Sequence, residues 1–127
     1  MAGRELRPAA FAAALLEWSQ GYHGFIDHAT AGFQANMLAG QRWPRCGAED
    51  RQANCLGKVA PLVARYAGSG ELAQKTAEAV RVHQDHDEPV QFAVAAALVL
   101  EQCVLGGSLA RALVRRAARR RVLRNAY

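Results

Sequence analysis

The sequence predicts an all-α fold. Alanine and leucine dominate the chain, and both residues favour helix. Apolar residues recur at three- and four-residue spacing, without the strict alternation of half-buried strands. The chain has 127 residues, of which 51% are hydrophobic and 21% charged, and this length and composition suit one packed domain.

Two helices are expected in the first 40 residues. Pro8 opens the first helix and Gly21 ends it, with three large apolar residues at helical spacing, Phe11, Leu15 and Trp18. A Gly-rich turn over residues 21–24 leads to a second helix from about Asp27 to Gly40. Its expected inward residues are Ala29, Phe33, Met37 and Leu38. Residues 41–52, with Pro44, Gly47 and a polar string, are predicted to form a loop.

Two further helical segments follow this loop. One runs from about Asn54 to Gly68, and Pro61 inside it implies a kink or a restart. Ser69 is expected to cap the next helix, whose inward stripe is Leu72, Thr76, Ala79, Val80 and His83. The residues expected to face water there are Gln74, Lys75, Glu78 and Arg81.

The most apolar segment lies between residues 87 and 105. Asp87 is expected to cap this helix, and Pro89 falls in its first turn. From Val90 to Leu105 the polar residues are Gln91, Glu101 and Gln102, so we expect other helices to enclose this one. Four preceding helices supply little apolar cover for it, which suggests that part of a larger fold is missing.

The net charge of +5 belongs to the C-terminal tail. Residues 107–127 contain no acid and seven arginines: Arg111, Arg115, Arg116, Arg119, Arg120, Arg121 and Arg124. The rest of the chain holds 9 basic and 11 acidic residues. Such a helix binds nucleic acid, anionic membranes or acidic partners. We favour a solvated end that binds nucleic acid only weakly and in a salt-sensitive manner.

The cysteines and the hydropathy pattern bear on the compartment. Cys46, Cys55 and Cys103 are too few and too widely spaced for a disulfide framework or a four-cysteine zinc site. No apolar run is long enough to span a bilayer, and the N-terminal residues do not resemble a secretion signal. We therefore expect free thiols and a location in the cytoplasm or the nucleus.

Two short segments are candidate sites of chemistry. Residues 83–88, His-Gln-Asp-His-Asp-Glu, carry ligand-type side chains for a divalent metal, but helix breaks commonly collect such residues, and we favour structural roles for them. Residues 47–54 lead into a helix whose free N–H groups suit a phosphate, yet Glu49 and Asp50 oppose an anion. No catalytic residue and no metal ligand are assigned from these patterns.

Several of these segments together resemble the ADP-ribosylglycohydrolase family. Residues 21–30 (Gly-Tyr-His-Gly-Phe-Ile-Asp-His-Ala-Thr) are similar to its Gly-Tyr-Gly…Thr turn and helix. Residues 47–54 and 58–62 resemble its Gly-Ser-x-Gly-Asn-Gly segment followed by Val-Ala-Pro, and residues 78–85 resemble its next helix. The crystallin J1 and selenoprotein J branch is the most similar. The resemblance covers roughly residues 8–107 and a middle portion of the family's fold.

The resemblance implies an incomplete orthogonal helical bundle and a glycosidic-bond hydrolase with two magnesium ions. The family's metal-binding acidic motifs would lie outside this chain, so no cofactor is expected for the chain itself. Asp50 falls where the family has serine, Asn54 falls one position after its asparagine, and His83 falls near its motif histidine. By resemblance, these three residues are the expected ligand-binding positions.

We expect residues 1–107 to form a partial glycohydrolase-like domain and residues 108–127 to form an Arg-rich helix or tail. The function favoured is a truncated or degenerate, non-catalytic ADP-ribosylglycohydrolase-like protein. Two alternatives stay open: a Mg-dependent ADP-ribosyl hydrolase completed by another chain or by self-association, and a binding module that acts through the basic tail.

Overall fold

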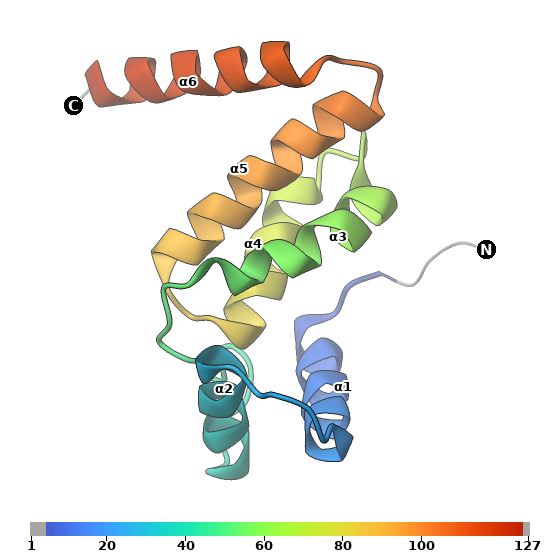
Figure 1. Cartoon of the computed structure of the whole chain (residues 1–127), viewed down its shortest axis with the longest axis vertical. Coiled ribbons are helices and arrows are strands. Elements are labelled where there is room, and N and C mark those ends of the chain that lie inside the picture. The colour runs from blue at the N-terminus through green and yellow to red at the C-terminus, as the bar shows by residue number, and fades with distance from the viewer. Residues whose placement is uncertain (1–4, 126–127) are drawn as a thin grey trace.

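The prediction of an all-α fold is confirmed. The computed structural model describes residues 5–125, with side chains for residues 5–118, and this part contains six α-helices, one 3₁₀-helix and no β-strand (Figure 1). The elements are α1 (Pro8–Gly21), α2 (His28–Leu38), η1 (Ala53–Lys58), α3 (Val59–Tyr66), α4 (Leu72–His83), α5 (Asp87–Val104) and α6 (Leu109–Asn125). None of these described helices combines the length and apolarity needed to cross a membrane.

The helices form two groups that share α4. In Figure 1, α1 and α2 lie side by side at one end, α3, α4 and α5 pack together above them, and α6 runs across the far end of α5. The larger core lies among α3, α4 and α5 and includes Val63, Leu72, Val80 and Ala93. The smaller core joins α1 and α2 to the end of α4 and consists of Ala12, Phe33, Met37, Cys46 and Val82.

The predicted loop between α2 and η1 is present, and it is fixed to the C-terminal end of α4. The Ala48 N–H donates to the His83 carbonyl at 2.9 Å, and the Asp85 N–H donates to the Ala48 carbonyl at 2.8 Å. A Cβ at Gly47 would lie 2.4 Å from the Arg81 carbonyl oxygen, so this close approach requires glycine. The loop therefore carries residues 48–52 directly beneath the end of α4.

The helix starts differ in part from the sequence prediction. The predicted restart near Pro61 occurs at Val59, because a proline in the first turn of α3 needs no N–H partner. Ser69 is not the cap of α4. Glu71 occupies that position, while the Ser69 hydroxyl donates to the Tyr66 carbonyl and accepts from the Glu71 N–H.

Asp87 is likewise not the cap of α5 but its first residue. His86 occupies the cap position, and its Nδ1 accepts a hydrogen bond from the Glu88 N–H at 3.1 Å. The Asp87 carboxylate pairs instead with Arg81. A capping histidine leaves this aspartate free to form the ion pair.

The burial prediction is correct for the stripe of α4, where all five expected residues are buried, but wrong for Leu38 and Lys75. Leu38 is 68% exposed because it lies about 100° around the helix from the buried Met37. Lys75 was expected to face water, yet it is buried and its Nζ donates to Glu5 Oε1 at 2.9 Å.

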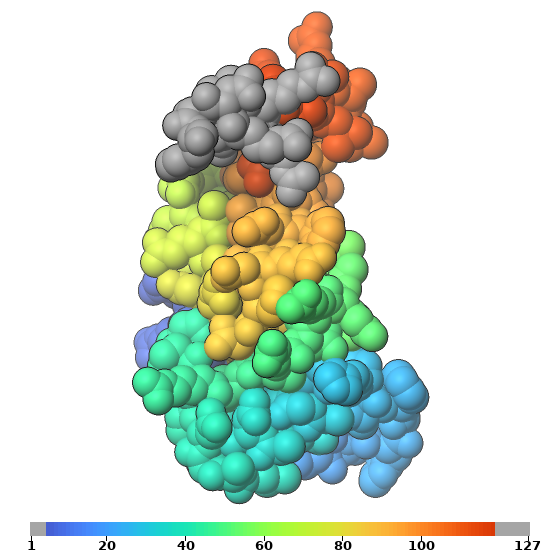
Figure 2. Space-filling view, turned by 90° about the vertical axis from the view of Figure 1, so that its left-hand side faces the viewer, coloured from blue at the N-terminus to red at the C-terminus, as the bar shows by residue number. Residues whose placement is uncertain are grey.

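Helix α5 is not enclosed as predicted. Only one face of it is buried, formed by Pro89, Val90, Ala93 and Ala97. Phe92 on another face is 51% exposed, and α5 forms part of the molecular surface between α4 and the segment containing η1 and α3 (Figure 2). The other described elements are too few to surround a helix of 18 residues.

Candidate ligand-binding cleft and its polar network

A cleft of about 490 Å³ opens where the end of α1, the 22–27 turn, the start of α2 and η1 come together. Four of its lining residues are apolar or aromatic and four are polar: Trp18, Tyr22, Phe25 and Ile26, then Asp27, Thr30, Gln52 and Asn54. An apolar wall facing convergent polar groups is the usual composition of a small-molecule site.

The aromatic wall depends on the Gly-rich turn. The Trp18 and Tyr22 rings stack with their centroids 4.8 Å apart and their planes 23° from parallel. A Cβ at Gly24 would lie 2.2 Å from the Tyr22 Oη, so only glycine at this position lets the tyrosine ring fold back over the turn. Trp18 is 54% exposed, which leaves its ring available to a ligand.

Asp27 supplies the negative charge of the cleft. One carboxylate oxygen accepts the Thr30 N–H at 2.8 Å and so caps α2, and the other accepts from Asn54 Nδ2. Burial alone would raise the pKa of Asp27, but hydrogen bonds from Thr30 and Asn54 outweigh it and hold the pKa below its usual value. The carboxylate is therefore ionised at neutral pH.

His83 lies beneath Thr30 and connects the cleft to Lys58. The Lys58 Nζ lies 2.8 Å from His83 Nδ1, and His83 Nε2 lies 2.9 Å from Thr30 Oγ1. A protonated lysine can only donate, so Nδ1 accepts and Nε2 carries the hydrogen given to Thr30. Burial, aided by the charge of Lys58, lowers the pKa of His83 to about 4. A histidine in this state cannot take a proton from Thr30, and the pair is not a nucleophile with its general base.

Asp50 anchors the loop behind the cleft. It is 6% exposed, and its Oδ1 accepts from the Gln52 N–H at 2.9 Å and from Gln84 Nε2 at 2.8 Å. Its Oδ2 lies 2.8 Å from His28 Nδ1. Burial by itself raises the pKa of Asp50, but the bonds from His28, Gln52 and Gln84 together leave it lowered. One buried carboxylate thus connects α2, the loop and the end of α4.

The three residues suggested by resemblance lie in this region in different roles. Asn54 lines the cleft, His83 supports Thr30 from beneath, and Asp50 is behind the lining, with its oxygens engaged by the protein. Sequence reasoning missed Lys58 and the chemical role of Asp27. The Asp-x-x-Thr spacing at the start of α2 is an N-cap pattern and could have identified Asp27.

The residues of the His-Gln-Asp-His-Asp-Glu segment, 83–88, have unrelated structural roles. His83 and Gln84 are buried in the network, and His86 caps α5. Asp85 and Asp87 both pair with Arg81, at 2.9 Å in the case of Asp85. Within the described residues, no three His, Cys, Asp or Glu side chains are grouped as metal ligands.

The carboxylates near the cleft do not fit the magnesium pair that the resemblance implies. Mg²⁺ takes octahedral oxygen ligands and relies on carboxylates with free oxygens. Both oxygens of Asp27 and both oxygens of Asp50 already accept hydrogen bonds from protein groups. A metal ion on these oxygens would compete with the hydrogen bonds that cap α2 and anchor the loop.

The predicted basic tail begins as helix α6. Arg111 and Arg115 are exposed and Arg116 is partly buried, while the side chains of Arg119, Arg120, Arg121 and Arg124 lie outside the described residues.

The chain matches no protein-family model, no curated protein and no solved structure. The case for a function therefore depends on the geometry of the cleft and on the sequence resemblance.

Proposed function

We propose that this chain is a non-catalytic, degenerate ADP-ribosylglycohydrolase-like domain that binds a nucleoside-type ligand in the cleft. One observation carries the proposal. Asn54 and His83, two of the positions taken from the resemblance, both act on the Asp27–Thr30 pair at the cleft, although the sequence separates them by 29 residues. An orthogonal bundle of that family is the architecture we infer for the fold.

The lining favours a planar ring attached to a hydroxylated group. An aromatic base can stack on the exposed ring of Trp18, which extends the existing Trp18–Tyr22 stack. The Asp27 carboxylate and the side chains of Thr30 and Asn54 can exchange hydrogen bonds with sugar hydroxyls. None of the described residues that line the cleft is an arginine or lysine, and Asp27 repels phosphate, so an uncharged nucleoside suits the cleft better than a diphosphate.

The absence of catalysis follows in this proposal from the state of the polar groups. His83 is neutral, donates to Thr30 and accepts from Lys58, so it has no free lone pair with which to remove a proton. Asp27 is ionised and engaged, which makes it a binding group rather than a proton donor. Free cysteines at positions 46, 55 and 103 support a reducing location, the cytosol or the nucleus.

Calorimetric titration of the purified chain with adenosine and with ADP-ribose tests the proposal. We expect adenosine to bind and ADP-ribose to bind more weakly. Trp18→Ala should weaken adenosine binding by about tenfold, since base–aromatic stacking contributes about 1–3 kcal/mol. Phe92→Ala is the matched control, because Phe92 is 51% exposed on α5 and does not line the cleft.

Two results would contradict the proposal. Equal loss of affinity in the Trp18 and Phe92 variants, or no adenosine binding at all, would remove the cleft as a nucleoside site. Turnover of an ADP-ribosylated protein by the purified chain with Mg²⁺ would show that the chain is catalytic after all.

A further inference from the structure

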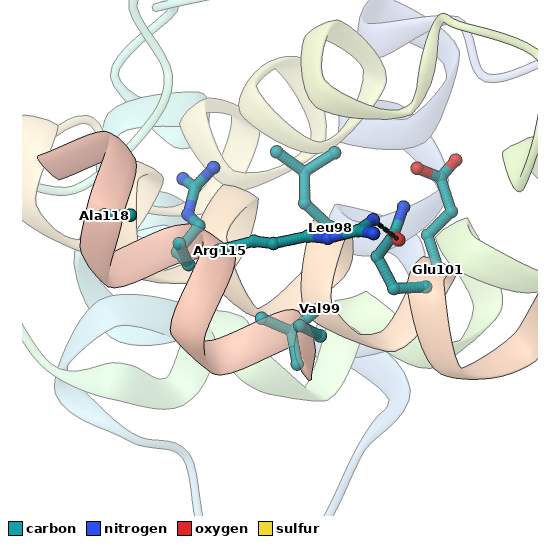
Figure 3. A pocket seen from close by; sticks show the side chains of 8 residues that line it. Leu98, Val99, Glu101, Arg115 and Ala118 are labelled. Atoms are coloured by element: carbon teal, nitrogen blue, oxygen red, sulfur yellow. Dashed lines mark hydrogen bonds between the residues drawn. The ribbon is translucent and has the colours of Figure 1, made fainter. Parts of the chain in front are cut away.

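A second hollow lies at the opposite end of the molecule, between α5 and α6. Its volume is about 510 Å³. Figure 3 shows Leu98, Val99 and Glu101 contributed by α5, and Arg115 and Ala118 contributed by α6. Gln102, Ala112 and Arg116 complete the lining. The floor is therefore aliphatic, and its α6 side carries two arginines.

The apolar surface continues beyond the groove at the turn between the two helices. Four aliphatic residues there are each more than half exposed: Val104 at 60%, Leu105 at 59%, Leu109 at 57% and Leu113 at 52%. Scattered apolar side chains are normal on a protein surface, but a group next to an apolar groove is typical of an interaction site.

Positive charge exceeds negative charge in the described part of this end of the molecule. Among the described residues, no acidic side chain forms an ion pair with Arg111, Arg115 or Arg116. Arg115 makes one long hydrogen bond, 3.4 Å, to Gln102 Oε1. The one acid in the lining, Glu101, accepts the Gly68 N–H at 2.9 Å. The sequence from 107 to 127 adds further arginines and no acid.

From these features we infer that the α5–α6 groove binds an acidic amphipathic helix of a partner protein. The partner's aliphatic side chains fill the floor formed by Leu98 and Val99, as in other helix-in-groove complexes. Its carboxylates pair with Arg115 and Arg116 at the rim. Arginine suits this position because its guanidinium is weakly hydrated and can bind a carboxylate through two hydrogen bonds.

The shape and composition of the groove favour this occupant over the other polyanions. Among the described residues that line it, none carries an aromatic ring on which a nucleic-acid base could stack. Phosphates would gain nothing from Leu98 or Val99. A flat lipid surface cannot fill a concavity between two helices, whereas a row of leucines on a helix can.

Fluorescence anisotropy with a synthetic peptide tests the inference on the full chain. The probe is a labelled helical peptide with leucines at three- and four-residue spacing and glutamates on its flanks. We expect saturable binding in the micromolar range that weakens as salt is raised. Two control peptides, one with lysine for glutamate and one with serine for leucine, should each bind at least about tenfold more weakly.

Variants of the chain locate the site. Arg115→Glu with Arg116→Glu should lower the affinity for the acidic peptide by about tenfold or more. The control, Arg45→Glu with Arg51→Glu, changes the net charge equally at exposed positions outside the groove and should have less than about a twofold effect. Val99→Asp should weaken binding, whereas Val114→Asp, at a residue 68% exposed and outside the lining, should not.

Three outcomes would overturn the inference: equal binding of the lysine peptide, equal loss in the two double-arginine variants, or tighter binding of a single-stranded RNA or an anionic vesicle than of the acidic peptide at physiological salt. If Val99→Asp does not fold, the serine-for-leucine peptide still tests the apolar contribution on the unchanged chain. None of these measurements depends on the cleft, so failure here leaves the nucleoside proposal intact.

Discussion

Polar contacts around the end of α4 connect segments that are distant in sequence, whereas the α5–α6 end leaves arginines and aliphatic side chains in solvent. Asp50 alone binds residues 22 and 34 positions away, and the Thr30–His83 contact spans 53 positions. At the other end, α6 packs mainly on the helix that precedes it. Long-range polar contacts thus order the cleft region, while the α5–α6 end keeps aliphatic side chains exposed.

The largest expected effect comes from removing the anchor of the cleft region. Asp50→Ala removes the carboxylate that accepts from the buried Gln84 amide and from the Gln52 N–H, so the Gln84–Gln52 contact and the Ala48 backbone bonds are left to hold the loop to the end of α4. We expect the free energy of unfolding to fall by about 3 kcal/mol, measured by urea denaturation. Glu49→Ala, at the exposed neighbouring acid, should change it by less than about 0.5 kcal/mol. Similar losses in both variants would refute the anchoring role.

The second effect is a dependence of stability on pH through His83. Its folded pKa of about 4 lies below the unfolded value of about 6.5. The unfolded chain therefore binds more protons between these values, so stability is full above pH 6.5 and declines as the pH falls toward 4. Between pH 6.5 and pH 5 the decline should be about 1.6 kcal/mol.

Urea denaturation across this pH range, repeated on two variants, assigns the effect. His83→Gln should flatten the profile above pH 5. Lys58→Met should reduce the slope, because it removes a positive charge that helps to lower the pKa of His83. If the dependence of stability on pH is unchanged in the His83 variant, other titratable groups must cause it. Asp27 and Asp50, whose pKa values are lowered, titrate only at lower pH.

The sequence predicted the elements of the fold well and the network poorly, for physical reasons. Helical spacing and Gly or Pro at the ends located the first five α-helices, since these signals are local, whereas residues 108–127 were expected to form either a helix or a tail. His83 was correctly expected on the buried side of its helix. The pairing of Lys58 with His83, and of His28 with Asp50, depends on a loop folding back under α4, and no local pattern encodes that approach.

The main error of the sequence prediction concerns the burial of α5. Its cause is again that a local pattern does not encode the packing of distant segments. An apolar helix was expected to be enclosed because apolar composition favours burial. Burial depends, however, on how many neighbours the fold supplies, and here one face of α5 is buried while most of its other residues are only partly covered. The sequence had signalled the shortage of cover, but it could not specify which face would stay open.

A smaller effect is expected in the cleft wall. Gly24→Ala forces the Tyr22 ring away from its place over the turn, because the new Cβ would lie within 3 Å of three of its atoms. Tyr22 is 44% exposed, so the ring can move and the loss of stability should be about 1 kcal/mol or less. Near-ultraviolet circular dichroism should still change as the Trp18–Tyr22 stack is lost. Gly21→Ala is the control, since a Cβ there meets nothing within 4 Å.

The smallest expected free energies are those of local opening, and amide hydrogen exchange can compare them between the two ends of the molecule. Helix α4 belongs to both cores, so its amides should exchange only when the whole domain unfolds. Among the described side chains of helix α6, only Ala112 is buried and only Arg115 forms a hydrogen bond to α5. Its amides should exchange through local opening that costs only about 1–2 kcal/mol. Saturation with the acidic peptide should slow exchange in α6 and not in α4, because a ligand stabilises the states that bind it. Equal protection of the two helices in the free chain would mean that the α5–α6 end is as firmly held as the network, and the contrast between them would fail.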